Sequence, residues 1–228
     1  QITMKYYANG KLLLTAEYFV LDGAWALALP TKYGQSLSVK ETPSGQHDVY
    51  WKSWDADQTI WFEARYQGTD YIKGTDNQVG NKLSEILQYC KQSNPDFLAH
   101  QSSIEVSTQL SFPRNWGLGT SSTLIYNLAK WANIDPYQLQ FQAFGGSGYD
   151  IACAGASGAI LYQKLANQPH VNVVAFDPPY KKQLYFVYLG KRQNSRAGIA
   201  RYRQKVGTQP SLITTMTKLT EAFLEVTA

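Results

Sequence analysis

The stretch from Phe112 to Ser122 joins an alternating apolar strand to an amphipathic helix, and it reads Phe-Pro-Arg-Asn-Trp-Gly-Leu-Gly-Thr-Ser-Ser. Apolar residues recur at even spacing before it and at helical spacing after it. Gly117 and Gly119 let the backbone approach a ligand closely because neither carries a Cβ atom. A helix N-terminus leaves backbone N–H groups unpaired and carries partial positive charge. The order strand, glycine turn, helix therefore predicts a phosphate-binding loop.

The two commonest phosphate-loop motifs are absent from this stretch. No lysine follows Gly119 as in GxxxxGK[ST], and Ser122 stands where GxGxxG needs its third glycine. Ser121 and Ser122 can cap the helix, or one hydroxyl can face a phosphate-bound Mg²⁺. By itself, the loop leaves a capped helix after a tight turn as an open alternative.

Three segments together resemble the GHMP kinases, the superfamily of galactokinase, homoserine kinase, mevalonate kinase and phosphomevalonate kinase. The family's ATP loop is matched at Pro113, Gly117, Leu118, Gly119, Thr120 and Ser121, with Ser122 in place of alanine. The segment from Gly10 to Gly23 is similar to the family's N-terminal motif, with Ala16 for glycine and Tyr18 for histidine. Gly146 to Ala152 resembles the segment that holds the catalytic aspartate in isoprenoid-pathway members, and its Gly-Tyr-Asp-Ile-Ala string marks one bacterial subfamily.

The resemblance implies an α+β, two-lobed fold. Strands cluster early and helices in the middle, which also favours α+β over a doubly wound parallel sheet. We expect an ATP-binding and catalytic lobe over residues 1–178 and the start of a ferredoxin-like substrate lobe over 179–228, with the boundary near Asp177-Pro178-Pro179. Nothing after Gly190 resembles the family's third, Gly-rich motif, so we expect further chain after Ala228.

The resemblance also implies roles for individual residues. Residues 117–122 with Pro113 bind ATP, and the Ser121 hydroxyl faces Mg²⁺. Asp150 takes the proton of the attacking hydroxyl or orients it, the alternative being an N-cap for the helix that follows. Lys11 neutralises charge on the reacting groups, the alternative being a solvated strand lysine. Substrate contacts are expected from Glu17, Ser147, Lys191, Arg192, Ser195 and Arg196, although an exposed turn at Glu17 and a solvated loop at 191–196 stay open.

The metal site has no second protein ligand in the sequence pattern. Mevalonate kinases place a glutamate about three helical turns before the catalytic aspartate, whereas residues 137–144 here contain no carboxylate. Gln138 or Gln142 could contact Mg²⁺ through water, because this ion keeps several waters and needs few protein ligands. Both glutamines are otherwise ordinary helix-surface residues.

Composition excludes several other classes of protein. The 228 residues are 44% hydrophobic and 17% charged, as in a globular protein. Without an apolar run of about 20 residues or a signal peptide, we expect a cytoplasmic protein that has no membrane contact. The net charge of +4 is scattered, which argues against nucleic acid as a partner. Cys90 and Cys153 are expected to be buried thiols, and a homodimer is left open.

Local patterns predict the elements around these motifs. Asn9-Gly10 indicates a hairpin turn between two short strands. Helices are expected at 79–90, at 124–132, from Asp135-Pro136 onward and at 212–226, where an apolar stripe must be buried. Further strands are expected at 24–29, 37–40, 49–51, 60–65, 104–112, 159–162 and 184–189.

Two functional hypotheses follow. The first is an ATP-dependent kinase, mevalonate kinase-like, that transfers the γ-phosphoryl group to a hydroxyl or phosphate of a small and anionic substrate; a sugar kinase of the same superfamily is the alternative. The second is a non-catalytic nucleotide or metabolite binder of the same fold. A lysine and an aspartate beside a phosphate loop favour the kinase, because a binder needs no base there.

Overall fold

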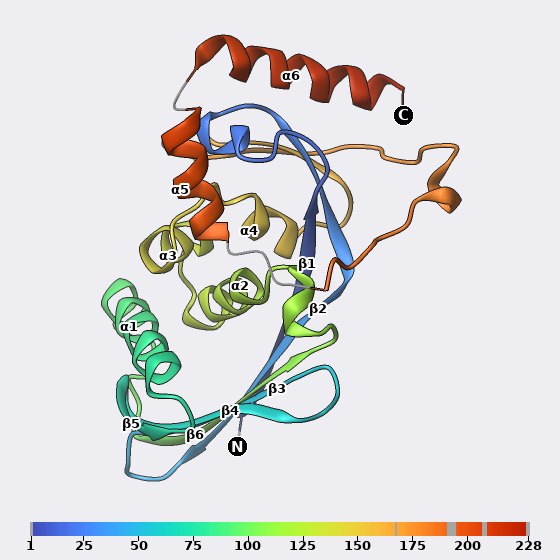
Figure 1. Cartoon of the computed structure of the whole chain (residues 1–228). Helices are drawn as coiled ribbons and strands as arrows, with labels where there is room; N and C mark the ends of the chain where they lie inside the picture. The colour runs from blue at the N-terminus through green and yellow to red at the C-terminus, as the bar shows by residue number, and fades with distance from the viewer. Residues whose placement is uncertain (1, 167, 191–194, 207–208, 227–228) are drawn as a thin grey trace. The chain divides into compact units, whose positions relative to one another are not determined.

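The computed structural model describes residues 2–166, 168–190, 195–206 and 209–226 (Figure 1). The chain forms two compact units. The first comprises residues 1–8, 33–114 and 120–145, and the second comprises residues 9–32, 115–119 and 146–228. Strands β1 (Ile2–Leu13) and β2 (Ala26–Pro43) are long enough to contribute to both units. Each unit is therefore built partly from the same two strands.

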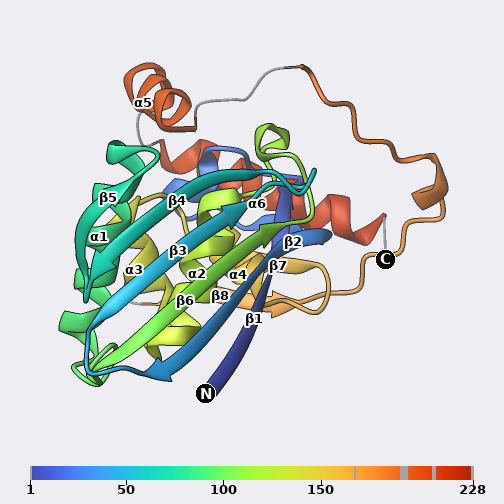
Figure 2. The same ribbon diagram turned by 90° about the horizontal axis from the view of Figure 1, so that it is seen from below.

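The first unit contains a mixed sheet. Its strand order is β5 (Asp70–Gly74), β4 (Ile60–Gln67), β3 (Asp48–Trp54), β6 (Ser102–Leu110) and the second part of β2, which lie side by side in Figure 2. Neighbouring strands are antiparallel except β3 and β6, which run parallel from the pair Asp48 and Ser103. Trp51, Phe62 and Tyr66 are almost fully buried, so this sheet contributes large side chains to the core.

Three helices, α1 (Asn77–Ser93), α2 (Thr120–Ala132) and α3 (Pro136–Ala143), lie on one face of this sheet (Figure 2). Buried polar contacts fix α2 on the sheet. Asn127 Nδ2 donates to the backbone oxygen of Gln35 at 2.9 Å, and Thr123 Oγ1 donates to Gln35 Oε1 at 3.0 Å. Because both donors are fully buried, these hydrogen bonds fix the rotation of α2 about its axis.

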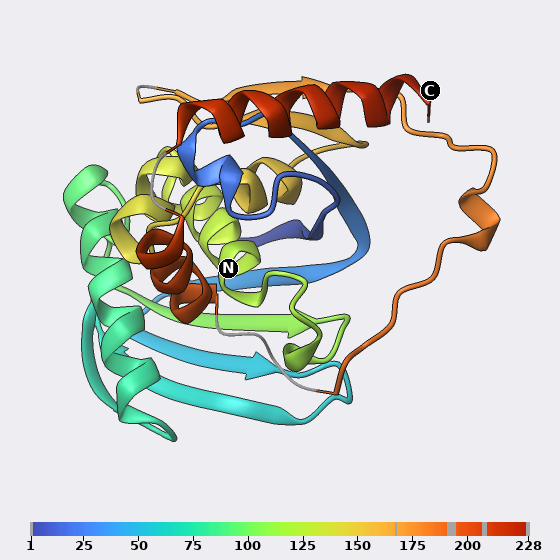
Figure 3. The same ribbon diagram turned by 45° about the horizontal axis from the view of Figure 1, so that its top comes forward.

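In the second unit, the first part of β2 pairs antiparallel with β7 (Ile160–Gln163), and β7 pairs with β8 (His170–Val173). The other elements in this unit are η1 (Phe19–Asp22), α4 (Tyr149–Ala154), η3 (Lys181–Gln183), α5 (Ser195–Lys205) and α6 (Pro210–Glu225). The short helix η2 (Arg114–Trp116) precedes the glycine loop. Helix α6 lies across the chain that leads into β2 (Figure 3), where Thr220 Oγ1 donates to Trp25 O at 2.9 Å. Thr220 is the buried residue of α6, whose other described residues are exposed or half-buried.

The mixed α+β class is confirmed, as are the helices over 79–90, 124–132 and 212–226 and the helix start at Asp135-Pro136, where the Asp135 side chain accepts from Tyr137 N. The predicted strands at 24–29 and 37–40 are one strand, β2. The prediction of a hairpin at Asn9-Gly10 is wrong, because β1 continues through both residues. Asn9 Nδ2 donates to Ala156 O at 2.9 Å, and the pairing of β1 with β2 decides against a local turn.

One prediction for the last fifty residues is also wrong. Residues 184–189 do not form a strand, and their side chains are exposed, Phe186 by 73% and Leu189 by 78%. An apolar run alone does not make a strand when no neighbouring strand supplies hydrogen bonds. On α6, Leu212, Leu219 and Val226 of the predicted apolar stripe are exposed, and Met216 and Phe223 are half-buried. The described residues thus cover this stripe only in part, and its burial stays a prediction.

No described helix is long and apolar enough to cross a membrane. The predicted lobe boundary near residue 178 stays a prediction. Residue 178 lies inside the segment 146–228, all of which belongs to the second unit.

Candidate functional site

Lys11 on β1 contacts the glycine loop through both its backbone and its side chain. Its backbone N donates to Leu118 O at 3.0 Å, and its ammonium donates to Gly117 O at 3.0 Å. The Asn9 side chain holds the same strand to Ala156 O, just beyond α4. Strand β1 therefore joins the loop at 115–119 to the region of α4, all within the second unit.

The loop has the backbone that its glycines allow. Gly117 and Gly119 have φ angles of 77° and 92°, which residues with a Cβ rarely adopt. A Cβ placed on Gly117 would meet no atom within 4 Å, and Gly117 is exposed. Leu118 between them is buried, so its side chain fixes the loop while the Gly117 backbone faces open space. This open, glycine-lined stretch fits a phosphate group.

The segment from Gly146 to Asp150 is held by β7 and the residue after it. Tyr162 Oη donates to Ser147 O at 2.6 Å, and Lys164 Nζ donates to Gly146 O at 2.9 Å. Helix α4 begins at Tyr149 with Gly148 as its N-cap residue, in the left-handed conformation. Asp150 therefore lies in the first turn, one position past the start, and the alternative that it is the N-cap is wrong.

Burial and nearby charges shift the pKa values of Tyr149 and Cys153 in this segment. Burial raises the pKa of the Tyr149 phenol well above its ordinary value, and the charges of Asp150 and Glu17 add to that rise. Burial also raises the pKa of the Cys153 thiol to about 12; Asp150 raises it further and Lys11 lowers it. Lys11, Glu17 and Asp150 therefore act on the same small region, and Cys153 is a protonated thiol at neutral pH, as expected for a buried cysteine.

The remaining predicted residues are distributed as follows. Pro113, Thr120, Ser121 and Ser122 belong to the first unit, where Ser121 is exposed in the first turn of α2 and Ser122 is buried. In the second unit, Glu17 is exposed, Ser147 is buried and Ser195 is exposed at the start of α5. Lys191 and Arg192 lie outside the described residues, as does the side chain of Arg196.

The backbone around Glu17 is unusual. Ala16 and Tyr18, on either side of it, have φ angles of 58° and 66°, in the left-handed region. Such conformations in residues with a Cβ persist only where the surroundings hold them, and they gather at functional sites. Here the Tyr18 ring stacks on Tyr202 of α5 at a centroid distance of 5.5 Å. Glu17 itself is exposed, and its functional role stays a prediction.

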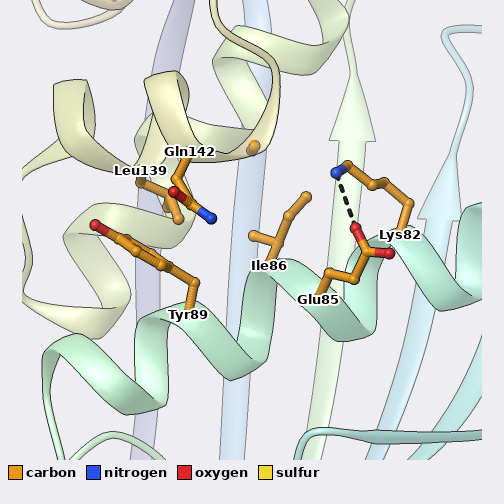
Figure 4. A pocket seen from close by; sticks show the side chains of 7 residues that line it. Lys82, Glu85, Ile86, Tyr89, Leu139 and Gln142 are labelled. Carbon is orange, nitrogen blue, oxygen red and sulfur yellow. Dashed lines mark hydrogen bonds and ion pairs between the residues drawn. The ribbon is translucent and has the colours of Figure 1, made fainter.

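Within the described residues, no group of three or more histidine, cysteine, aspartate or glutamate side chains could hold a metal ion. A hollow of about 50 Å³ lies in the first unit between α1 and α3 (Figure 4). Gln142, the proposed water-mediated metal contact, lines it together with Tyr89 and the ion pair of Lys82 and Glu85. Ligand pockets usually exceed about 300 Å³, so this hollow is too small for a nucleotide.

Sequence reasoning missed two contributors to the site. Tyr149, the variable position of the Gly-x-Asp segment, places its ring beneath the Lys11 ammonium, 5.6 Å from the centroid. Asn9 was assigned to a turn, yet it anchors β1 near α4. The proximity of Tyr149 to Asp150 in sequence was the one available signal, because Lys11 lies far from both along the chain.

No protein-family model matches the sequence, and no curated protein matches it. Solved structures do match. Over 99% of this chain and 69% of the other, the fold is similar to Leishmania major mevalonate kinase in complex with R-mevalonate, with a TM-score of 0.63 and 16% identity. Over 100% of this chain and 74% of the other, it is similar to Streptococcus pneumoniae phosphomevalonate kinase in complex with phosphomevalonate and AMPPNP, with a TM-score of 0.63 and 15% identity.

A putative sugar kinase from Campylobacter jejuni also matches, with a TM-score of 0.54 and 17% identity over 76% of this chain. The chain spans 59% of the length of that sugar kinase. At these identities the comparisons establish the fold, which is the α+β fold of these small-molecule kinases.

Proposed function

We propose that this protein is an ATP-dependent small-molecule kinase that phosphorylates a hydroxyl or phosphate group of a small, anionic substrate. The observation that carries the proposal is the junction of three distant segments within one unit. Lys11 contacts Gly117 and Leu118 of the glycine loop on one side and the Tyr149 ring, next to Asp150, on the other. The solved structures with this fold support the proposal through the ligands bound in them, which are R-mevalonate in one and phosphomevalonate with AMPPNP in the other.

The residues present suit a nucleotide. Gly117 offers open space at the position a side chain would occupy, and Lys11 brings a cation to the same loop. In the proposal, residues 117–122 hold the phosphates through backbone N–H groups. The exposed Ser121 hydroxyl would contact Mg²⁺, which needs few protein ligands when the phosphates supply the others. Bound Mg²⁺ neutralises charge on the transferring group.

In the proposed reaction, the substrate hydroxyl oxygen forms a bond to the γ-phosphorus while the bond from that phosphorus to the β-γ bridging oxygen breaks. Asp150 accepts the proton that the hydroxyl loses, and ADP carries away the bridging oxygen. Lys11 compensates negative charge on the phosphoryl oxygens as it spreads between the attacking and leaving groups. The proposed substrate contacts are the cationic side chains at positions 191, 192 and 196 together with Glu17, Ser147 and Ser195. An anionic substrate would suit those cations.

The test uses the full chain with Mg-ATP and a panel of hydroxy acids, phosphorylated alcohols and sugars. Mg-ATP at a hundredfold excess over its dissociation constant should stabilise the protein by about 2.7 kcal/mol. Release of ADP that depends on one member of the panel would identify the substrate class. Stabilisation without any ADP release would favour a non-catalytic nucleotide binder, and no stabilisation at all would refute the nucleotide site.

A further inference from the structure

The ring of Tyr149 lies beneath Lys11. Among the described residues of the second unit, Lys11 is the lysine that contacts the glycine loop. The Lys11 ammonium is 5.6 Å from the centroid of the Tyr149 ring and 3.0 Å from Gly117 O. A lysine side chain has a flexible four-carbon stem, so one hydrogen bond to a carbonyl leaves the ammonium several alternative positions. The ring and the carbonyl together limit those positions.

The ring belongs to a residue at the start of a buried helix. Tyr149 is the first residue of α4, directly after Gly148, and the residues that follow Asp150, Ile151 to Ala154, are buried. Burial and the nearby carboxylates raise the pKa of the phenol, so the ring is neutral at physiological pH. Lys11 therefore lies against an uncharged ring.

An aromatic ring differs from a carboxylate in what it does to a lysine. A carboxylate would pair with the ammonium and compete with a phosphate for it. The ring attracts the cation through its negative face, yet carries no net charge and leaves the positive charge of Lys11 intact. The arrangement orients the ammonium without neutralising it, which suits a group that must attract phosphate.

We infer that Tyr149 is a positioning residue: its ring face holds the Lys11 ammonium at the glycine loop, ready to contact the phosphates of the nucleotide. The inference rests on the proposed function, because it concerns the same site. It adds a residue whose contribution is made through Lys11 and depends on the electron density of its ring.

The experiment replaces Tyr149 by phenylalanine and, through an unnatural amino acid, by pentafluorophenylalanine, and measures the dissociation constant of Mg-ATP by calorimetry. The two rings have nearly the same shape, but fluorination removes the negative face. The fluorinated ring should weaken Mg-ATP binding about two- to tenfold relative to phenylalanine. A purely structural ring would give equal constants. The pair Arg65 and Tyr50 in the first unit, with the guanidinium 5.7 Å from the ring centroid, supplies a matched control. The same replacements at Tyr50 should leave the constant unchanged.

The outcomes separate the two ideas. If the parent protein binds Mg-ATP and the two ring variants at position 149 bind it equally, the role of Tyr149 is refuted while the proposed function stands. If the parent protein does not bind Mg-ATP, the nucleotide site itself is refuted and the role of Tyr149 with it.

Discussion

Gly117→Ala should weaken nucleotide binding at a small cost in stability. The residue has a φ angle of 77°, so an alanine there adopts a left-handed conformation that costs about 1–2 kcal/mol. The new methyl group meets no protein atom within 4 Å, so no packing penalty is added. It would instead occupy the open space proposed for phosphate. A tenfold loss of affinity would lower the stabilisation by Mg-ATP from about 2.7 to about 1.4 kcal/mol at the same concentration.

Gly45→Ala is the matched control, because Gly45 has a φ angle of 70° and equally open space where the new methyl group would lie, but sits between β2 and β3. Thermal unfolding of both variants should show similar losses of stability without ligand, near 2–4 °C per kcal/mol for a chain of about this size. With Mg-ATP, only the Gly45 variant should regain the full shift of the parent protein. A Gly117 variant that regains the same shift would show that the loop does not hold phosphate.

Three further predictions concern other groups. Asp150→Asn keeps the shape and removes the proton acceptor, so turnover on the identified substrate should fall about 10²- to 10⁴-fold while the dissociation constant of Mg-ATP, measured by calorimetry, stays near the parent value; undiminished turnover would leave Asp150 without a role in proton transfer. The pKa values of Cys90 and Cys153 are raised from 9.0 to about 12 by burial, so the folded protein keeps both protons where the unfolded chain loses them. The contribution of these thiols to the free energy of unfolding is therefore fully present below about pH 9, and it should fall by up to about 1.4 kcal/mol per pH unit for each thiol between about pH 9 and 12. In urea unfolding across this range, the Cys90→Ala, Cys153→Ala protein should lose stability less steeply than the parent protein. An equally steep loss in both proteins would contradict the raised pKa values. Tyr202→Phe removes the hydrogen bond of 2.6 Å from the Tyr202 hydroxyl to Asp22, whose side chain is only 5% exposed, and should destabilise the protein by about 1–3 kcal/mol in urea unfolding; Tyr185→Phe, at a side chain that is 83% exposed, should have no measurable effect.

The elements that the sequence predicted correctly depend on local chemistry. Asp135-Pro136 supplies its own cap and first-turn φ angle, and the stripe over 79–90 defines the buried face of α1 without help from distant residues. The glycine loop belongs to the same class, since the positive φ angles of Gly117 and Gly119 are conformations that glycine adopts readily. These features could be predicted from the sequence because each is determined by residues that lie close to one another along the chain.

The errors arose where pairing with a distant segment competes with a local preference. Asn9-Gly10 is a good turn sequence, yet pairing with β2 and the contact with Ala156 keep β1 extended. Residues 184–189 have the composition of a strand but do not pair with any described strand. Strand formation depends on hydrogen bonds that another segment must supply, so composition could not decide either case.

For the candidate site, the sequence by itself determined the chemical groups: a glycine loop, a lysine, and an aspartate after a Gly-x pair. Only the tertiary structure decided that Lys11 binds the loop at Gly117 and rests on Tyr149, and that Asp150 follows the N-cap of α4 instead of forming it. The physical reason is the range of the interactions. Backbone preferences of single residues act locally, whereas the position of an ammonium group is set by a carbonyl and a ring that lie more than a hundred residues away along the chain.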